Sequence, residues 1–293
     1  MESGRPRVGY LGPEGTFSEE ALLASAAPGA AEPAPAGSIF ETVAALRQGG
    51  VDFSIVPLEN SLEGSIGVTL DLLAGEARDV EIVGEALLRV RHSLIAAEPM
   101  ALEQIDTVIT HPQVPGQCAS FLRRELPHAR VLPASSTAEA VRVVASASEP
   151  GQAALGTVLA AEIYGGTVLR EGVQDRDDNE TRFVWLARAG TGAVPPLRAA
   201  AGAAWRTSLA FWGQGADSPG WLVRCLDEFA GRAINLTRIE SRPLRERLGT
   251  YMFFVDLEGS VGEPGVAAAI AGVSALCEEV MVLGSYRAAA PPE

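Results

Sequence analysis

Three Ser/Thr-x-x-Glu patterns constrain the fold of this chain more than any other feature. They begin at Thr16, Ser38 and Ser136. In each, the hydroxyl group and the glutamate three residues later can cap the first turn of a helix. Strand-like apolar runs alternate with these helices. This alternation predicts an α/β fold with mostly parallel strands in two lobes, the second formed by residues near 83–160. The predicted strands are residues 7–11, 52–56, 105–109, 129–132 and 152–156.

The order of elements changes in the last third of the chain. Residues 189–205 contain a Pro pair and no apolar period, which predicts a linker. Residues 206–287 then give the order β-α-β-β-α-β of the ferredoxin-like plan. A sheet of this kind leaves an edge strand that commonly pairs with another chain, so we expect a homodimer or homotetramer. The predicted strands are residues 206–212, 233–239, 250–256 and 279–283, and the predicted helices are 219–231 and 265–276.

The composition excludes several classes of site and partner. All 23 basic residues are Arg, so a Schiff-base lysine or a phosphate-loop lysine is excluded. Three His and three separated Cys, with no HExxH or CxxC motif, predict neither a metal site nor a disulfide. A net charge of −14 argues against nucleic acid and anionic membranes. With no apolar signal region at the start and no apolar run of about 18 residues, we expect a cytoplasmic protein with buried free thiols.

The segment Asn179–Phe183 carries the residue that we rank first as a functional candidate. Its charged and amide groups run directly into the apolar residues Phe183–Leu186. The segment therefore brings Thr181 to the end of a buried strand. Polar groups at such strand ends are where binding sites are commonly built. The alternative is a solvated turn before an edge strand.

A second polar stretch follows Pro57, the residue at which we expect a strand to end. Asn60 and Ser61 supply neutral donors, which can orient a bound anion without titrating. Glu59 could act as a base, but its carboxylate would repel an anion. We therefore favour Asn60 and Ser61 over Glu59. An Asx turn between a strand and a helix is the alternative reading of this stretch.

A third polar stretch, beginning at Thr110, lies at another strand end and on the next helical turn. Gln113 and Gln117 are four residues apart and share a helix face. His111 could serve as a general acid, but a His before Pro in a turn is often structural, so we rank it below Thr110 and Gln117. Three polar strand ends in one chain predict one shared cleft.

Two helix starts are weaker candidates. Gly12–Ser18 places free backbone N–H groups at a helix N-terminus, which suits a carboxylate or a phosphate. Capping of its own helix by Thr16 is the alternative. In the C-terminal part, Gly220 begins a helix, and residues 240–242 concentrate polar groups at the end of a strand. An interface or ligand role is plausible there, against a helix cap and a charged edge strand.

Taken together, these motifs resemble those of the prephenate dehydratase family over nearly the whole chain. The motifs have the family's order and spacing. The C-terminal part resembles an ACT regulatory domain. The resemblance implies a two-lobed catalytic domain like that of periplasmic binding proteins over residues 1–188. We expect the monofunctional form, since no chorismate mutase segment precedes Met1. The matching motifs are Gly12–Ser18, Pro57–Ser61, His111–Gln113 with Gln117, Asn179–Phe183, Pro219–Leu222 and Glu240–Pro243.

The resemblance implies an activity and a set of site residues. The chain would convert prephenate to phenylpyruvate, carbon dioxide and water in L-phenylalanine biosynthesis, with no cofactor. Thr181 would be the catalytic residue and donate a hydrogen bond to the leaving hydroxyl. Asn60, Thr110 and Gln117 would hold the substrate. For Arg182, a position in solvent is the alternative to a substrate contact. The further substrate contacts that we expect are Thr16, Ser61, Arg182, Phe183 and His111.

In this family, phenylalanine binds the ACT domain and inhibits the enzyme. The family's regulatory helix usually begins Gly-Ala-Leu, whereas this chain has Trp221 at the second position. Its indole could fill or reshape the amino-acid pocket, or face away and leave the control intact. Arogenate as substrate, or a non-enzymatic small-molecule sensor, are the alternatives for the whole chain. The implied effector residues are Gly220, Trp221, Leu222, Asn235, Leu236, Glu240 and Ser241.

Overall fold

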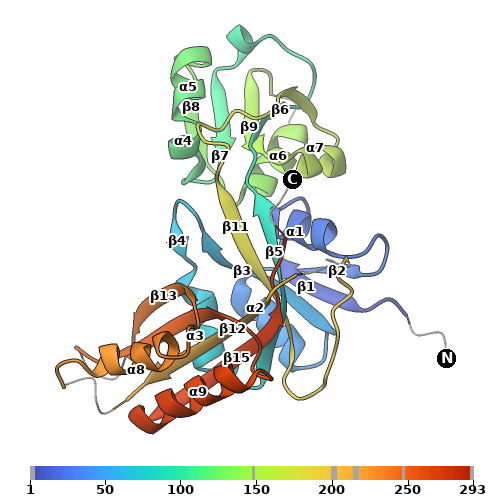
Figure 1. Ribbon diagram of the computed structural model, residues 1–293. Helices are drawn as coiled ribbons and strands as arrows, with labels where there is room; N and C mark the ends of the chain where they lie inside the picture. The colour runs from blue at the N-terminus through green and yellow to red at the C-terminus, as the bar shows by residue number, and fades with distance from the viewer. Residues whose placement is uncertain (1–3, 147–148, 199–202, 214–217, 246–247, 291–293) are drawn as a thin grey trace.

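The computed structural model describes residues 4–146, 149–198, 203–213, 218–245 and 248–290. Within these residues, three separate sheets organise the chain into a mixed α/β fold (Figure 1). We call the bodies built on them the first lobe, the second lobe and the C-terminal unit. The first lobe lies between the other two (Figure 1).

The first lobe has one layer of helix on each face of its sheet. Helix α1 (Phe17–Ser25) packs on the face that we call the front. Helices α2 (Ile39–Arg47) and α3 (Gly67–Ala74) pack on the opposite, back face. In spatial order the sheet contains β2 (Glu32–Ala36), β1 (Arg7–Leu11), β3 (Phe53–Asn60), β11 (Glu180–Arg188) and β5 (Val80–Arg89), and the short β4 (Gly64–Ser65) pairs with β3.

Alternate residues of β11 serve the two faces, as the pleat of a strand requires. Phe183 and Trp185 belong to the buried cluster on the front face, which α1 covers. Val184 and Leu186 belong to the cluster on the back face. Their neighbour Thr181 is therefore on the front.

A β-bulge in β3 decides which residues of that strand face the front. The register between β3 and β11 shifts by one residue at Leu58. The extra residue reverses the alternation, so that Asn60 lies on the front face, paired with Thr181. The prediction that Pro57 ends the strand is wrong. A proline is tolerated at a bulge because the ladder of hydrogen bonds is already interrupted there.

Two of the three predicted helix caps form as the sequence indicates. Ser38 Oγ accepts the N–H of Glu41 over 3.1 Å. Ser136 Oγ accepts the N–H of Glu139 over 3.0 Å at the start of α6 (Thr137–Ser146). Each hydroxyl satisfies one of the N–H groups that the first turn of a helix leaves without a partner.

The cap at Thr16 differs from the prediction. Its hydroxyl donates to the carbonyl oxygen of Leu11 over 2.8 Å and does not cap α1. The Glu19 carboxylate instead accepts the N–H of Gly15 over 2.5 Å. Gly15 has a φ of +81°, and a Cβ there would lie 2.7 Å from the Cα of Ala160 in the second lobe. The loop before α1 is therefore shaped by contact with the other lobe.

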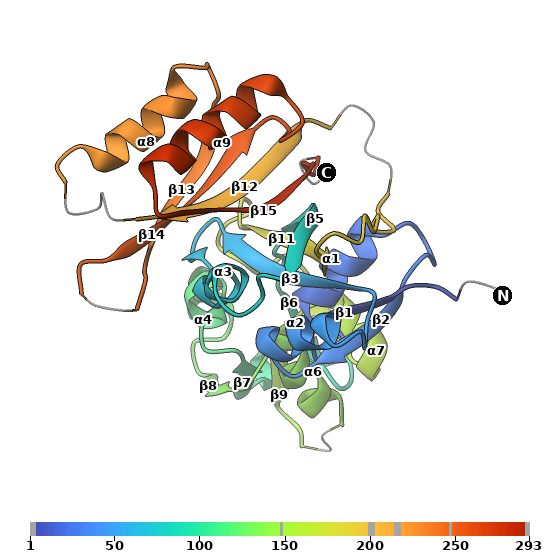
Figure 2. The same cartoon turned by 90° about the horizontal axis from the view of Figure 1, so that it is seen from below.

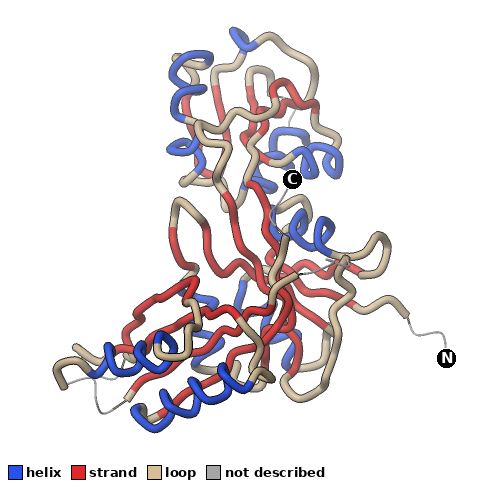
Figure 3. The backbone as a smooth tube through the Cα atoms, viewed as in Figure 1, coloured by secondary structure: helices blue, strands red, loops and turns tan. Residues whose placement is uncertain are grey.

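The second lobe is joined to the first by two chain segments. One follows β5 and the other precedes β11 (Figure 3). The sheet of this lobe spans residues 93–170, so the predicted range of about 83–160 begins inside β5, a strand of the first lobe. In spatial order it contains β10 (Thr167–Arg170), β6 (Ser93–Ala96), β9 (Gln152–Gly156), β7 (Thr107–Thr110) and β8 (Arg130–Pro133), with helices α4 (Val114–Gln117), α5 (Ala119–Glu125), α6 and α7 (Val158–Tyr164).

The alternation of strands and helices predicts mostly parallel strands in the two lobes. This prediction is wrong, because both sheets are mixed. Strands β1, β2 and β3 run parallel to one another, as do β7, β8 and β9. Strand β11 is antiparallel to both its neighbours, and so is β6. The reason is that the chain leaves the first lobe along β5 and returns along β11 beside it.

The C-terminal unit has its elements in the predicted order β-α-β-β-α-β, with its second strand shifted. That strand was expected at residues 233–239, but residues 231–233 form the turn that closes α8, where Ala233 has a φ of +55°. Both helices lie on the side of the sheet away from the first lobe (Figure 2). The order in space is β13 (Leu236–Pro243), β14 (Tyr251–Glu258), β12 (Trp205–Trp212) and β15 (Glu279–Arg287), with helices α8 (Trp221–Ala230) and α9 (Pro264–Leu276).

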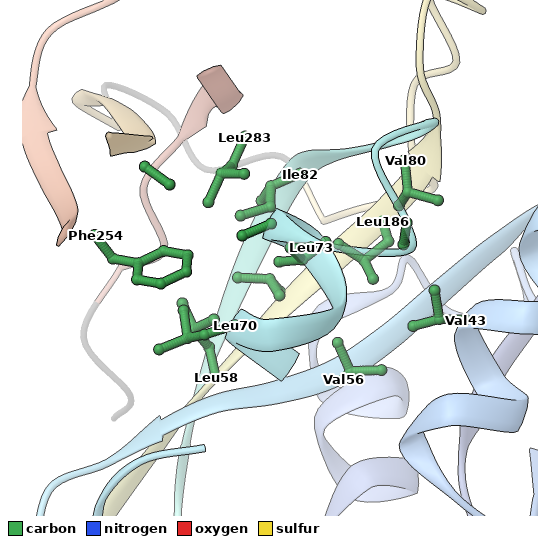
Figure 4. Packing of buried hydrophobic residues seen from close by; sticks show 14 of the residues in the cluster. Val43, Val56, Leu58, Leu70, Leu73, Val80, Ile82, Leu186, Phe254 and Leu283 are labelled. Carbon is green, nitrogen blue, oxygen red and sulfur yellow. The ribbon is translucent and has the colours of Figure 1, made fainter. Parts of the chain in front are cut away.

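The open face of the C-terminal sheet packs on the back of the first lobe. Phe254 and Leu283 from this sheet join Leu58, Leu70 and Ile82 of the first lobe in one buried cluster (Figure 4). A continuous apolar core across two units resembles the interior of one domain. The C-terminal sheet is thereby held directly behind β3, β11 and β5.

Candidate active site

A cleft of about 910 Å³ lies between the two lobes. The first lobe contributes the loop between β1 and α1 and the ends of β3 and β11 that lie closest to the second lobe. The second lobe contributes the turn after β7 and the start of α6. The predicted site residues that line this cleft are Thr16, Asn60, His111, Gln117, Thr181 and Phe183.

Asn60 and Thr181 are hydrogen-bonded to each other on the front face of the first lobe. The Asn60 Nδ2 group donates to Thr181 Oγ1 over 2.9 Å. The orientation of this amide is fixed, because its Oδ1 accepts the N–H groups of Leu62 and Glu63, each over 2.9 Å, and an N–H can only donate. Thr181 Oγ1 therefore acts as acceptor toward Asn60. Its own proton is left for a second partner, and the side chain lines the cleft.

The same direction of donation continues across the cleft to the second lobe. Asn60 Nδ2 also donates to Asn179 Oδ1 over 2.8 Å, and Asn179 Nδ2 donates to Gln117 Oε1 over 3.2 Å. The Gln117 oxygen also lies 2.9 Å from His92 Nε2. Because that oxygen can only accept, His92 must donate. The Gln117 Nε2 group then faces Glu63 Oε1 at 3.4 Å, with the cleft beside it.

The ring of His92 is buried and held in one tautomer. It meets Phe17 edge to face, with 5.4 Å between ring centroids. Its Nδ1 atom is buried and has no hydrogen-bond partner among the described residues. Burial lowers the pKa of His92 more than the hydrogen bond to Gln117 raises it. A neutral ring with its proton on Nε2 satisfies these contacts.

His92 and Asn179 were missed as site residues by the sequence analysis. They lie on the two segments that cross between the lobes, and these segments are tied together by the Val90 N–H, which donates to the Asn179 carbonyl over 2.8 Å. Asn60 stands out in the sequence as a polar residue at the end of a strand. His92 has the same property, because it comes just after β5. Asn179 lies within the segment singled out for Thr181.

Two predicted site residues point away from the cleft. Thr110 is fully buried, and its hydroxyl donates to the Leu155 carbonyl on the neighbouring strand over 2.8 Å. Ser61 Oγ accepts the N–H of Glu180 over 3.0 Å and donates to the Asp178 carbonyl over 3.2 Å. Both hydroxyls hold backbone in place, so the prediction that they contact substrate is wrong in this structure.

Arg182 lies on the back of β11, opposite to Thr181, as the pleat requires. Its guanidinium group contacts Glu85 Oε2 at 2.8 Å, Asp256 Oδ2 at 2.6 Å and the Tyr286 hydroxyl at 2.7 Å. Burial alone would lower the pKa of Arg182, but these acidic groups outweigh it and raise the pKa above its usual range. The prediction that Arg182 contacts substrate is therefore wrong, and solvent exposure is also excluded.

Three predicted substrate contacts remain, namely Phe183, Thr16 and His111. Phe183 supplies an apolar wall to the cleft. The Thr16 hydroxyl is already occupied by the Leu11 carbonyl. His111 lies in the turn after β7, where its Nδ1 is 3.5 Å from the Gln113 N–H. His111 keeps polar atoms available to a ligand, whereas the Thr16 hydroxyl can only accept a further hydrogen bond.

No arginine lines the cleft among the described residues. Its charged groups are carboxylates, from Glu14, Glu63 and Glu139. The cleft also receives the N-termini of two helices, α1 from the first lobe and α6 from the second. A helix N-terminus carries a partial positive charge and free N–H groups, so it can bind a carboxylate without a basic side chain.

The predicted effector residues are divided between two places. Gly220, Trp221 and Leu222 line a cavity of about 280 Å³ at the start of α8. Glu240 accepts a hydrogen bond from Ser65 of the first lobe over 3.0 Å. Asn235, Leu236 and Ser241 do not line the cavity. The indole of Trp221 is turned into the core against Phe211 and Phe253, and its N–H donates to the Leu276 carbonyl over 2.7 Å, so it does not occupy the cavity.

Three further features of the described residues concern metal sites, membrane spans and cysteines. No group of three or more His, Cys, Asp or Glu side chains is arranged there to hold a metal ion. No helix in that part of the chain is long and apolar enough to cross a membrane. Cys118 and Cys225 are buried free thiols, and Cys277 is a half-buried one.

Comparison with known proteins gives matches over nearly the whole chain. Residues 8–191 match the model of the family named prephenate dehydratase. A prephenate dehydratase of Mycobacterium sp. (strain KMS) is 40% identical over 98% of this chain and 92% of its own length. The crystal structure of a prephenate dehydratase from Arthrobacter aurescens, in complex with L-Phe, is 35% identical with a TM-score of 0.84, and covers 96% of this chain and 89% of that chain. GqqA, described as a novel type of quorum quenching acylase, is 29% identical with a TM-score of 0.84 over 97% of this chain and 98% of its own.

Proposed function

The chain belongs to the prephenate dehydratase family and so converts prephenate to phenylpyruvate in L-phenylalanine biosynthesis, and we propose that it does this in the cleft between the lobes. Thr181 is the residue that assists the departing hydroxyl. The observation that carries this assignment is the hydrogen bond from Asn60 to Thr181 Oγ1. Because Asn60 supplies the proton in that bond, the Thr181 proton remains available to the substrate.

The reaction calls for a donor of this kind. The bond between the ring and its carboxylate breaks and releases carbon dioxide, and the electron pair moves through the ring to expel the hydroxyl group. The ring becomes aromatic, which supplies much of the driving force. Negative charge develops on the departing oxygen, which leaves as water after taking up a proton. A preorganised donor aimed at developing charge typically contributes a factor of about 10² to 10³ in rate.

The part of the lining that the structure describes contains no arginine, which suits a substrate that must lose a carboxylate. A close arginine would stabilise the carboxylate before it leaves and so oppose its loss. We propose that the N-termini of α1 and α6 orient the two carboxylates of prephenate from opposite lobes. Partial charges of helix ends are weaker than a full ion pair, so they orient the group at a smaller cost to the later step.

Gln117 completes the site from the second lobe. His92 and Asn179 both donate to its Oε1 atom, which fixes the amide plane and turns its Nε2 group toward the cleft and Glu63. A donor fixed in this way holds the substrate without the entropy cost of ordering a free side chain. Asn60, Gln117 and Thr181 therefore act as one preorganised set.

We further propose that the C-terminal unit is an ACT domain that binds phenylalanine in the cavity at the start of α8. The Arthrobacter relative, which is described in complex with L-Phe, supports this proposal. So does Trp221, because its indole packs in the core and leaves the cavity free. Strand β13 is an edge of the described sheet, and pairing of such edges would give the proposed homodimer.

The test is phenylpyruvate formation from prephenate by the wild type and by Thr181→Ala, each with and without phenylalanine. We expect turnover by the wild type, a loss of about 10² or more in the variant, and inhibition of the wild type by phenylalanine. Full turnover by Thr181→Ala would reject the assigned role of Thr181. Arogenate is tested as a second substrate in the same assay. A wild-type enzyme that is active only on arogenate would show that arogenate, and not prephenate, is the substrate.

A further inference from the structure

A cluster of charges, four of its six buried, lies directly behind the catalytic strands. It consists of three arginines and three carboxylates, so its charge is balanced, and it spans the first lobe and the C-terminal unit. Two hydroxyl groups complete it, and we call the whole set the back cluster. Its members are Arg182, Glu59 and Glu85 from the first lobe, and Arg206, Arg238, Asp256, Ser208 and Tyr286 from the C-terminal unit.

Arg182 is the centre of the back cluster. Each of its three guanidinium nitrogens has its own partner, Glu85, Asp256 or the Tyr286 hydroxyl, at 2.8, 2.6 and 2.7 Å. Its side chain is 9% exposed, and those of Glu85 and Asp256 are 1% and 2% exposed. A planar guanidinium group held in three directions has no rotamer freedom left. Two of these contacts, to Asp256 and Tyr286, tie strand β11 to the C-terminal unit.

Stability alone is a poor explanation for such a cluster. The four buried charges are those of Arg182, Arg238, Glu85 and Asp256. Burying them costs desolvation energy, and apolar packing of the same volume is often as stable or more so. The surroundings are apolar, since Leu58, Ile82 and Phe254 pack nearby in the shared core. What two ion pairs and a hydrogen bond on one guanidinium group provide beyond apolar packing is a defined position for each partner.

The positions that the back cluster fixes are those of the proposed catalytic pair. Arg182 follows Thr181 directly in β11, and Glu59 precedes Asn60 in β3. A second contact reaches the same place, because Ser65 of β4 bonds Glu240 and Arg238 of the C-terminal unit, and β4 pairs with β3 at Asn60. Both halves of the pair are thus held from behind by the C-terminal sheet.

We propose that Arg182 is a positioning residue for the reaction, which sets the Thr181 hydroxyl against Asn60 by anchoring the start of β11 to the C-terminal sheet. The proposal rests on the proposed role of Thr181. It makes the C-terminal unit part of the active site's geometry. A displacement of the Thr181 donor by about 1 Å is enough to cost up to about 10² in rate.

The primary test is the kinetics of Arg182→Gln and Tyr286→Phe with prephenate. Tyr286→Phe keeps all the charges and removes only the hydroxyl that bonds Arg182 and Ser208. We expect kcat to fall about tenfold or more in Arg182→Gln and several-fold in Tyr286→Phe, with KM nearly unchanged. If Arg182→Gln does not fold, Tyr286→Phe alone decides, and wild-type kcat in that variant overturns the proposal.

The matched control is Arg242→Gln. Arg242 makes a bidentate ion pair with Asp71 across the same interface, at 3.0 and 2.7 Å, but its partner is on α3 and not on a catalytic strand. We expect the control to keep the wild-type kcat. A fall in kcat as large as that of Tyr286→Phe would show a general effect of the interface and would overturn the specific role of Arg182.

A double variant separates this proposal from the function on which it rests. If Tyr286 acts through Thr181, Tyr286→Phe will lower kcat in the wild type but will have no further effect in a Thr181→Val background. Equal effects in both backgrounds would contradict the positioning role while leaving Thr181 catalytic. Thr181→Val with the wild-type kcat would instead reject the proposed role of Thr181, on which this proposal rests.

Discussion

The two faces of the strand pair β3 and β11 are built from opposite kinds of side chain. The front face presents an amide and a hydroxyl, Asn60 and Thr181, to the cleft. The back face presents a carboxylate and a guanidinium group, Glu59 and Arg182, to the C-terminal sheet. In the reaction that we propose, neutral groups lie where the substrate changes charge, whereas the full charges lie at the contact with the C-terminal sheet. Of these four residues, Asn60 and Thr181 thus face the cleft, and Glu59 and Arg182 attach the strands to the C-terminal sheet.

This separation depends on register, which the residues alone do not reveal. The bulge at Leu58 moves Asn60 to the front and Glu59 to the back. Without it, a carboxylate would stand beside Thr181 in the cleft. Electrostatics favours Asn60 over Glu59 as the residue that faces an anionic substrate. The bulge is the feature of the backbone that turns Asn60 toward the cleft.

The largest effect is expected when the back face loses its central charge. Arg182→Met removes the closest ion pair of the buried Asp256, which keeps Arg238 at 3.9 Å. It also removes an ion pair of the buried Glu85, which keeps Arg206. The free energy of unfolding should therefore fall by about 3–5 kcal/mol. Denaturant unfolding measures this. Arg47→Met is the control, because its exposed pair with Asp79 should contribute about 1 kcal/mol or less. If the free energy of unfolding falls equally in the two variants, the buried ion pairs of Arg182 contribute no more to stability than an exposed pair.

The front face is tested by reversing the direction of its hydrogen bonds. Asn60→Asp replaces the donor to Thr181 with an acceptor, so the Thr181 proton should turn to the new carboxylate and away from the cleft. We expect kcat to fall by about 10² to 10³. Gln48→Glu, an equal change of charge at the exposed end of α2, should leave kcat unchanged. An Asn60→Asp variant with near wild-type kcat would contradict the assigned direction.

His92 should behave as a neutral donor. Burial lowers its pKa below the usual 6.5, so between these two values the unfolded chain binds this proton more readily than the folded chain. The His92 contribution to stability should therefore be lost as pH falls below about 6.5. His92→Phe should flatten that part of the pH profile of unfolding and lower kcat several-fold by freeing Gln117. An unchanged profile would mean that His92 titrates normally.

The smallest effect is expected at the contact between α1 and the second lobe. Burial, more than the neighbouring carboxylates of Glu162 and Glu19, raises the pKa of Glu20 from 4.5 to about 7. The folded chain therefore holds this proton where the unfolded chain has lost it, so stability should fall as pH rises from 4.5 through 7. Glu20→Gln should remove this slope, as measured by unfolding at several pH values. A slope that persists in the variant would assign it to another group.

Local features of the fold were predictable from the sequence, because they depend on neighbouring residues. The helix starts at Ser38 and Ser136 need only a hydroxyl and a nearby N–H. Strand β2 was missed because its two prolines argue against a strand, although an edge position tolerates them. The antiparallel return of β11 follows from the path of the chain through the second lobe, which no local pattern encodes.

The site was predictable to the level of strand ends but not of side-chain direction. Asn60, Gln117 and Thr181 were found because polar residues after strands tend to meet at one edge of a sheet. Thr110 has the same local pattern, yet its hydroxyl is taken by the Leu155 carbonyl, a partner 45 residues away. Arg182 fits the pattern equally well and points to the other face. Such outcomes depend on contacts distant in sequence.

The chemistry that we propose takes place at the uncharged front face and depends on the free proton of Thr181. The most direct test compares kcat for phenylpyruvate formation in Thr181→Val and Thr181→Ser, each checked for folding by thermal unfolding. The account predicts that Val, which keeps the shape but has no donor, loses a factor of about 10² or more, whereas Ser retains most of the activity. A Thr181→Val enzyme that turns over prephenate at the wild-type rate would contradict it.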